Sequence, residues 1–156
     1  MGAPAVRPRG VPAPPGPVTM ARVVALVPDL LFGSRVQGGL QRAGHEVELF
    51  GDERSLRDRL RDSSAPDPAV LVVDLTSEDL DGASVVEALS GEGGLARIRT
   101  LGFYAHVDLR ARERAVQAGF DLIVPRSRMA REGEELVARM AAGGPSDGST
   151  GPPPQA

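Results

Sequence analysis

Three residues that could act on a charged ligand each lie at the end of a short apolar run. These are Asp29, Asp74 and Arg126. Two converging carboxylates can hold a hard cation through their oxygens, and a cation and a guanidinium together can neutralise an anion such as a phosphoryl group. Each aspartate taken alone is better explained as a cap of the following helix or turn. The chemistry therefore requires a fold that brings the three side chains together.

A second group of polar residues follows another apolar run. Tyr104 ends this run, and His106 and Asp108 come shortly after it. A histidine and a carboxylate in one loop could form an additional metal or catalytic site. We favour the simpler interpretation, in which His106 is a loop residue and Asp108 caps the next helix.

Apolar runs alternate with amphipathic stretches between residues 20 and 142. The predicted strands are Arg22–Val27, His45–Phe50, Ala69–Leu75, Ile98–Phe103 and Asp121–Val124. The predicted helices are Leu31–Arg42, Asp52–Asp62, a segment containing Val85–Leu89, Leu109–Ala118 and Ser127–Ala142. Strands that alternate with helices in this way predict an α/β fold, a doubly wound five-stranded parallel sheet with helices on both faces. Ligands of such sheets bind beyond the carboxyl ends of the strands, where the polar residues above would lie.

The segment VLVVDLTSEDLDG (residues 70–82) resembles a response-regulator receiver (CheY-like) domain. In that family a phosphoacceptor aspartate ends the third strand and an Asp-Gly pair follows. The resemblance puts Asp74 at the acceptor position and Asp29 at the second of two metal-binding acids. It puts Tyr104 and Arg126 at the switch positions, where the family has Thr or Ser and Lys. It implies strand order 2-1-3-4-5, Mg²⁺ bound by Asp29 and Asp74, and a sensor kinase as partner.

Several positions of the phosphorylation site depart from the family pattern. Pro28 replaces the first metal-binding acid, which should weaken Mg²⁺ binding because the ion has few protein ligands to begin with. Tyr104 is too long to bond an acyl phosphate as threonine does. Arg126 keeps the charge of lysine but is a planar fork, and we expect it to form an ion pair with Asp74.

We therefore predict a stand-alone, receiver-like signalling and protein-interaction module that needs no cofactor and is not conventionally phosphorylated. The alternative is a working phosphoacceptor of a two-component phosphorelay that uses Asp74 and Mg²⁺. Enzymes of other kinds are disfavoured, because no G-x-S-x-G elbow is present and a dinucleotide-binding glycine pattern is missing after the first strand. We expect His45 to have no ligand role.

Composition limits the compartment and the partners. The chain has 156 residues, a formal net charge of −3, no cysteine and no apolar run near the length of a membrane helix. We expect one cytoplasmic domain, without a membrane partner, over residues 20–142. The Pro/Gly-rich segments 1–19 and 143–156 should be disordered tails, and Met20 could be the true start. Few aromatic residues disfavour nucleic acid, whereas arginines in the second half predict an acidic protein partner near the last two strands.

Overall fold

The chain forms one five-stranded, all-parallel sheet with the strand order β2-β1-β3-β4-β5. A computed structural model describes residues 20–142, so the predicted tails 1–19 and 143–156 lie outside the described residues. The strands are β1 (Arg22–Leu26), β2 (Glu46–Phe50), β3 (Val70–Asp74), β4 (Arg99–Tyr104) and β5 (Leu122–Pro125). The helices are α1 (Leu30–Arg42), α2 (Glu53–Arg61), α3 (Gly82–Gly91), α4 (Leu109–Ala118) and α5 (Arg126–Ala141). None of these helices is both long enough and apolar enough to cross a bilayer.

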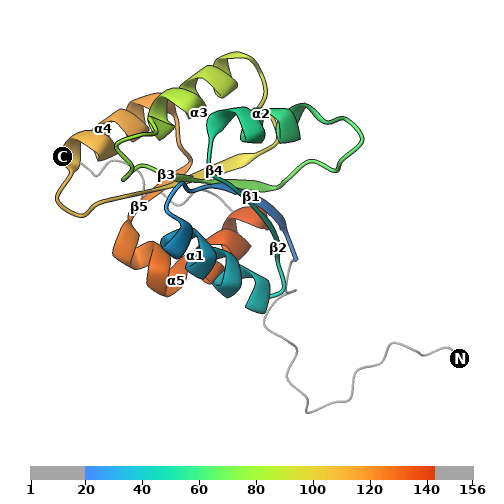
Figure 1. Cartoon of the computed structure of the whole chain (residues 1–156), viewed down its shortest axis with the longest axis horizontal. Coiled ribbons are helices and arrows are strands. Elements are labelled where there is room, and N and C mark those ends of the chain that lie inside the picture. The colour runs from blue at the N-terminus through green and yellow to red at the C-terminus, as the bar shows by residue number, and fades with distance from the viewer. Residues whose placement is uncertain (1–19, 143–156) are drawn as a thin grey trace, which may run out of the picture.

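Helices cover both faces of the sheet (Figure 1). α1 and α5 pack on one face, and α2, α3 and α4 pack on the other. Successive residues of a strand point to opposite faces, so Val70 and Val72 join the core under α1 and α5, while Leu71 and Val73 join the other core. A strand covered on both sides must be apolar throughout, which explains the uninterrupted run in β3.

The predicted fold class and strand order are confirmed. The predicted element boundaries lie close to the observed ones, with the largest difference at α3. This helix begins at Gly82, before the apolar segment Val85–Leu89 that indicated it. Its start is set by Asp81, whose Oδ1 accepts a hydrogen bond from the backbone N–H of Ser84 at 3.1 Å.

Gly82 lets α3 begin directly against the end of β3. A Cβ atom at this position would lie 2.5 Å from Cγ1 of Val73 and 3.0 Å from the carbonyl oxygen of Asp74. Neither the backbone at Asp74 nor the buried side chain of Val73 can move aside without a cost in free energy. The Asp-Gly pair thus combines a helix cap with a close approach between helix and strand.

We expect Gly82→Ala to lower the free energy of unfolding by about 1–3 kcal/mol, because the added methyl group overpacks this junction. Gly91→Ala is the matched control in the same helix, since no neighbouring atom lies within 4 Å of a Cβ there. It should leave stability unchanged or raise it by up to about 1 kcal/mol through better helix propensity. Urea denaturation of both variants tests the contrast, and equal effects would contradict it.

His45, directly before β2, forms a hydrogen bond with Ala21, directly before β1. Its side chain is buried, and Nδ1 accepts a hydrogen bond from the backbone N–H of Ala21 at 3.1 Å. The chain reaches it through a tight turn in which Gly44 has a φ of 98°. Burial lowers the pKa of His45 below its ordinary value, and the nearby Glu134 carboxylate partly opposes this. The contact with Ala21 requires an unprotonated Nδ1 and gives His45 a structural role.

This contact predicts a loss of stability in mild acid. Because the folded-state pKa of His45 lies below its unfolded value of 6.5, the unfolded chain binds more protons between the two values. The stabilisation is complete above about pH 6.5 and falls as the pH drops toward the folded-state pKa. Urea midpoints measured from about pH 7 to pH 5 should decline for the wild type and less for His45→Gln. His106→Gln removes the second of the two histidines, which is exposed, and should keep the wild-type slope.

Candidate functional site

The residues singled out from the sequence gather at the carboxyl edge of the sheet. Asp29 lies between β1 and α1, Asp74 ends β3, Tyr104 ends β4, and Arg126 begins α5. All the strands are parallel, so these ends share one edge. The fold thus places these residues at one edge of the sheet, and the contacts of each side chain decide what the site can do.

Both carboxylate oxygens of Asp29 are engaged. Oδ1 caps α1 by accepting the backbone N–H groups of Leu31 and Phe32, each at 3.0 Å. Oδ2 accepts a hydrogen bond from Nη2 of Arg126 at 3.3 Å. The N–H of Phe32, then the N–H of Leu31 and the charge of Arg126, hold the pKa of Asp29 below its ordinary value, although partial desolvation opposes them.

Arg126 is also held by an aromatic ring. Its Cζ lies 4.2 Å from the ring centroid of Phe32, a distance typical of a cation–π contact. The ring of Phe32 packs in turn on that of Phe103, with centroids 5.0 Å apart. Both members of the Asp29–Arg126 pair are partly exposed, so the pair adds little to stability. Its main consequence is that it fixes where the guanidinium lies.

Asp74 is bound by its own turn. The residue is 1% exposed, and its Oδ1 accepts hydrogen bonds from the backbone N–H and the hydroxyl of Thr76, at 2.7 and 2.6 Å. Within residues 20–142, Oδ2 has no hydrogen-bond partner. The expected ion pair between Asp74 and Arg126 is wrong, because Arg126 pairs with Asp29 instead. Thr76 supplies donors to Asp74 from two residues away, and stacking on Phe32 directs the guanidinium toward α1.

Tyr104 takes no part in these contacts. Its side chain is buried in the apolar core beneath α3 and α4, and its hydroxyl bonds to no described residue. Among residues 20–142 no cluster of three or more His, Asp or Glu side chains could hold a metal ion. The metal-binding role of Asp29 and Asp74 stays a prediction.

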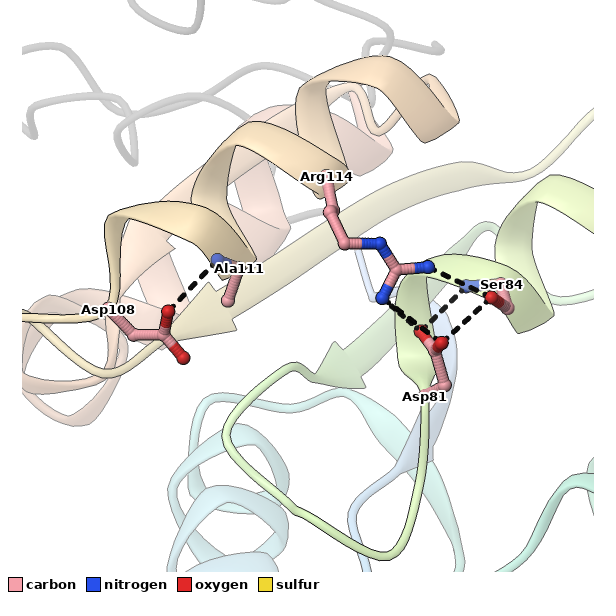
Figure 2. Close-up of polar contacts among 5 residues, drawn as sticks. All are labelled: Asp81, Ser84, Asp108, Ala111 and Arg114. Carbon is pink, nitrogen blue, oxygen red and sulfur yellow. Dashed lines mark hydrogen bonds and ion pairs between the residues drawn. The ribbon is translucent and has the colours of Figure 1, made fainter.

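Asp108 is a helix cap. Its Oδ1 accepts a hydrogen bond from the backbone N–H of Ala111 at 3.0 Å at the start of α4 (Figure 2). His106 is exposed in the preceding loop and has no partner within the described part of the chain. The favoured interpretation of Asp108 is confirmed, and a chemical role for His106 stays a prediction.

A polar cluster beside the site joins α4 to the start of α3 (Figure 2). Nη1 of Arg114 donates to both carboxylate oxygens of Asp81, at 2.9 and 3.0 Å, and Nη2 donates to Oγ of Ser84 at 3.0 Å. Ser84 in turn donates its backbone N–H and its hydroxyl to Asp81. The spacing of Asp81 and Ser84 signals the cap, whereas no local pattern identifies Arg114.

Sequence reasoning missed two residues that shape the site, Thr76 and Phe32. The Asp-x-Thr spacing is typical of a turn in which the aspartate accepts bonds from two residues ahead, so Thr76 could have been found. Phe32 carries no such signal, because an apolar residue at helical spacing indicates a core position in general.

The Thr76 contacts predict different effects for two substitutions of Asp74. Asp74→Asn keeps the accepting oxygen and removes a buried charge, so the free energy of unfolding should stay the same or rise. Asp74→Ala removes the acceptor of both Thr76 bonds and should lower it by about 1–3 kcal/mol. Urea denaturation measures both, with Asp67→Asn in an exposed loop as the control for charge removal. A marked loss for Asp74→Asn would indicate that the Asp74 charge is directly paired after all.

Comparison with solved structures identifies the fold. The phosphorylated cyanobacterial phytochrome response regulator RcpA matches with a TM-score of 0.68 and 14% identity, over 81% of this chain and 97% of that one. The receiver domain of the putative response regulator NarL from Mycobacterium tuberculosis has a TM-score of 0.64 and 23% identity, over 80% and 98%. The chemotaxis response regulator CheY4 of Vibrio cholerae has a TM-score of 0.66 and 19% identity, over 78% and 99%. No protein-family model and no curated protein sequence matches this chain. The chain therefore has the fold of a response-regulator receiver domain.

Proposed function

We propose that this chain is a receiver-like signalling module that acts through protein contacts and is not phosphorylated with Mg²⁺ in the usual way. The engagement of both Asp29 oxygens carries this proposal, because Arg126 supplies a permanent cation beside the remaining acid of the predicted metal pair. The fixed Asp29–Arg126 pair would take the place of a reversible phosphorylation switch.

Electrostatics at this site disfavours a divalent cation. A metal ion bound to Asp29 would have to displace the guanidinium or lie beside it, and like charges repel. It would also compete with the cap of α1 for Oδ1. Mg²⁺ requires a near-ideal octahedron of oxygens, and Pro28 offers no carboxylate to complete one.

The surroundings of Asp74 also disfavour phosphoryl transfer. Such transfer depends on positioning and on charges that neutralise the phosphoryl oxygens. Arg126 pairs with Asp29, and Tyr104 packs into the core, so neither side chain forms a hydrogen bond with Asp74. Thr76 already occupies one oxygen of the acceptor carboxylate.

The surface at α4 supports an acidic protein partner with apolar contacts. Val107 and Leu109 are strongly exposed at the start of this helix. Arg110 and Arg112 lie beside them in the sequence and form no ion pair with any described residue. Exposed apolar side chains next to uncompensated cations suit a partner that offers both apolar and acidic groups.

The alternative function, a phosphoacceptor receiver supplied by a sensor kinase, is supported by Asp74 at the end of β3 and by the Asp-Gly pair at Asp81 and Gly82. RcpA, which shares the fold, is a phosphorylated protein. The two functions differ in whether Asp74 accepts a phosphoryl group when Mg²⁺ is present.

The decisive experiment compares the wild type with a variant that carries the receiver family's residues at positions 28, 104 and 126. We expect the wild-type chain, incubated with acetyl phosphate and Mg²⁺, to keep its intact mass, and we expect Mg²⁺ to leave its urea midpoint unchanged. A Pro28→Asp/Tyr104→Thr/Arg126→Lys variant should be stabilised by Mg²⁺ and gain the mass of one phosphoryl group.

Adding Asp74→Asn to this restored variant is the control and should abolish the mass gain. Circular dichroism verifies that each variant is folded. A wild-type chain that gains one phosphoryl group, and loses this ability with Asp74→Asn, would refute the proposal and establish the phosphoacceptor function.

A further inference from the structure

A groove of about 720 Å³ runs between α1 and α5, which lie side by side on one face of the sheet (Figure 1). Apolar and cationic side chains of α1 contribute to its lining. The last described residue, Ala142, caps the end of α5, one of the two helices that flank the groove. We propose that the segment that follows, residues 143–156, turns back from Ala142 and binds along this groove.

The direction of the two helices brings the start of this segment close to the groove. α1 and α5 each begin at the carboxyl edge of the parallel sheet and run back toward the opposite edge. Gly39 and Glu134 mark the same level on the two helices, because a Cβ atom on Gly39 would lie 3.5 Å from a carboxylate oxygen of Glu134. At about 1.5 Å per helical residue, Ala142 lies about 12 Å beyond that level and Arg42 about 5 Å beyond it. The segment therefore leaves α5 only about 7 Å past Arg42.

The sequence of the segment permits a return toward the groove. Gly143 and Gly144 follow α5 directly, and glycine readily adopts the backbone conformations that end a helix and reverse the chain. Asp147 lies five residues after Ala142, and an extended chain of that length spans up to about 17 Å. Asp147 can therefore reach Arg42 even after the chain has reversed its direction.

The order of side chains along the segment matches the order along the groove. Asp147 is the one charged side chain of the segment, and three consecutive prolines follow it at positions 152–154. A chain that returns from the end of α5 passes Arg42 first and Leu31 last. The helix measures about 17 Å between these two residues, and an extended proline-rich chain measures about 19 Å from Asp147 to the middle proline. An acid beside the arginines thus leaves the prolines beside the leucine.

The charge of the segment complements the charge of the groove. Arg35 and Arg42 form no ion pair or hydrogen bond with any residue that the structure describes. The lining holds these two arginines and one carboxylate, Glu134, so its formal charge is +1. Asp147 on the α1 side of the groove would lie beside uncompensated positive charge. Residues 1–19 fit less well, because they carry two arginines and no acid.

The prolines suit the exposed apolar end of the groove. Leu31 is 81% exposed, although a leucine gains free energy by leaving water. Consecutive prolines hold an extended conformation before they bind, so packing them on Leu31 costs little conformational entropy. A segment with too little apolar surface to fold alone can be ordered by a groove that supplies this surface.

Attachment to α5 makes a weak contact sufficient. A short flexible connection gives the segment an effective concentration on the order of millimolar at the groove. A contact with a dissociation constant in that range would therefore be formed about half of the time. A partner that binds the α1 face has to displace the segment, which makes the segment an intramolecular inhibitor of that face. The contact uses neither Asp74 nor the Asp29–Arg126 pair, so this proposal and the proposed function can fail separately.

Paramagnetic relaxation enhancement in the full-length chain tests the contact. The chain has no cysteine, so Gln155→Cys provides a single site for a nitroxide label. The label should broaden the amide signals of Leu31 and Ser34 near the start of α1. Those of Ser90 and Gln117, on helices of the other face, should stay sharp. Raising NaCl to about 0.5 M should weaken the broadening, because salt screens exposed charges.

Charge exchange identifies the groove residues that bind Asp147. Asp147→Arg alone, and Arg35→Glu/Arg42→Glu alone, should each lower the enhancement at Leu31 about threefold or more. The variant that combines all three substitutions should regain it, because the opposite charges again face each other. Arg61→Glu reverses an exposed arginine of α2 on the other face and should leave the enhancement unchanged. Circular dichroism verifies that each variant is folded.

A mixed sample separates contacts within one copy from contacts between copies. It contains nitroxide-labelled chain without isotope and isotope-labelled chain without nitroxide, and its amide signals should stay sharp. Broadening in the mixture would overturn the proposal, because the segment would then bind a second copy. A label that broadens only signals close to Ala142 would overturn it as well. Enhancement at Leu31 that survives Asp147→Arg, or that the combined variant fails to regain, would show that the charges do not direct the segment and would also overturn it.

Discussion

The burial of β3 between two helical layers is the constraint on which the rest of the structure depends. All five of its residues are buried, and the first four alternate between the core under α1 and α5 and the core under α2, α3 and α4. Because β3 lies between β1 and β4, it also sets the register of both neighbours. Its last residue, Asp74, must therefore end in a nearly water-free position. A buried carboxylate needs hydrogen-bond donors, and the next turn provides them through Thr76.

The hydrogen-bond donors near Asp29 and Asp74 decide which of the two carboxylates Arg126 pairs with. Asp29 lies at the start of a helix, where two backbone N–H groups bind one of its oxygens and leave the other for Arg126. Phe32 lies one turn along that helix and holds the guanidinium by its ring. The first turn of α1 thus presents both a carboxylate and an aromatic face to Arg126. A lysine would gain less from this arrangement, because it lacks the planar group that stacks and forks.

Glycines serve opposite purposes in different parts of the fold. Gly82 is required by close packing, because α3 begins against the backbone of β3. A Cβ atom on Gly38 would meet only the guanidinium end of Arg42, at 3.3 Å, so its lack of a side chain leaves the core unaffected. The same residue type, read from the sequence, gave no means of separating these roles, because the difference depends on what lies opposite in space.

The sequence by itself determined the order and type of the elements, the parallel sheet and the edge at which polar residues gather. These follow from hydrophobic periodicity and chain connectivity, which are local properties. It also determined the Asp108 cap, because the bond spans only three residues. Only the tertiary structure decided that Arg126 pairs with Asp29 in place of Asp74, that Phe32 stacks on it, and that Arg114 reaches Asp81. These choices depend on side-chain directions over a few ångströms among groups distant in sequence. Two carboxylates that meet at one edge are equivalent partners for a guanidinium until the packing around them makes one of them easier to reach.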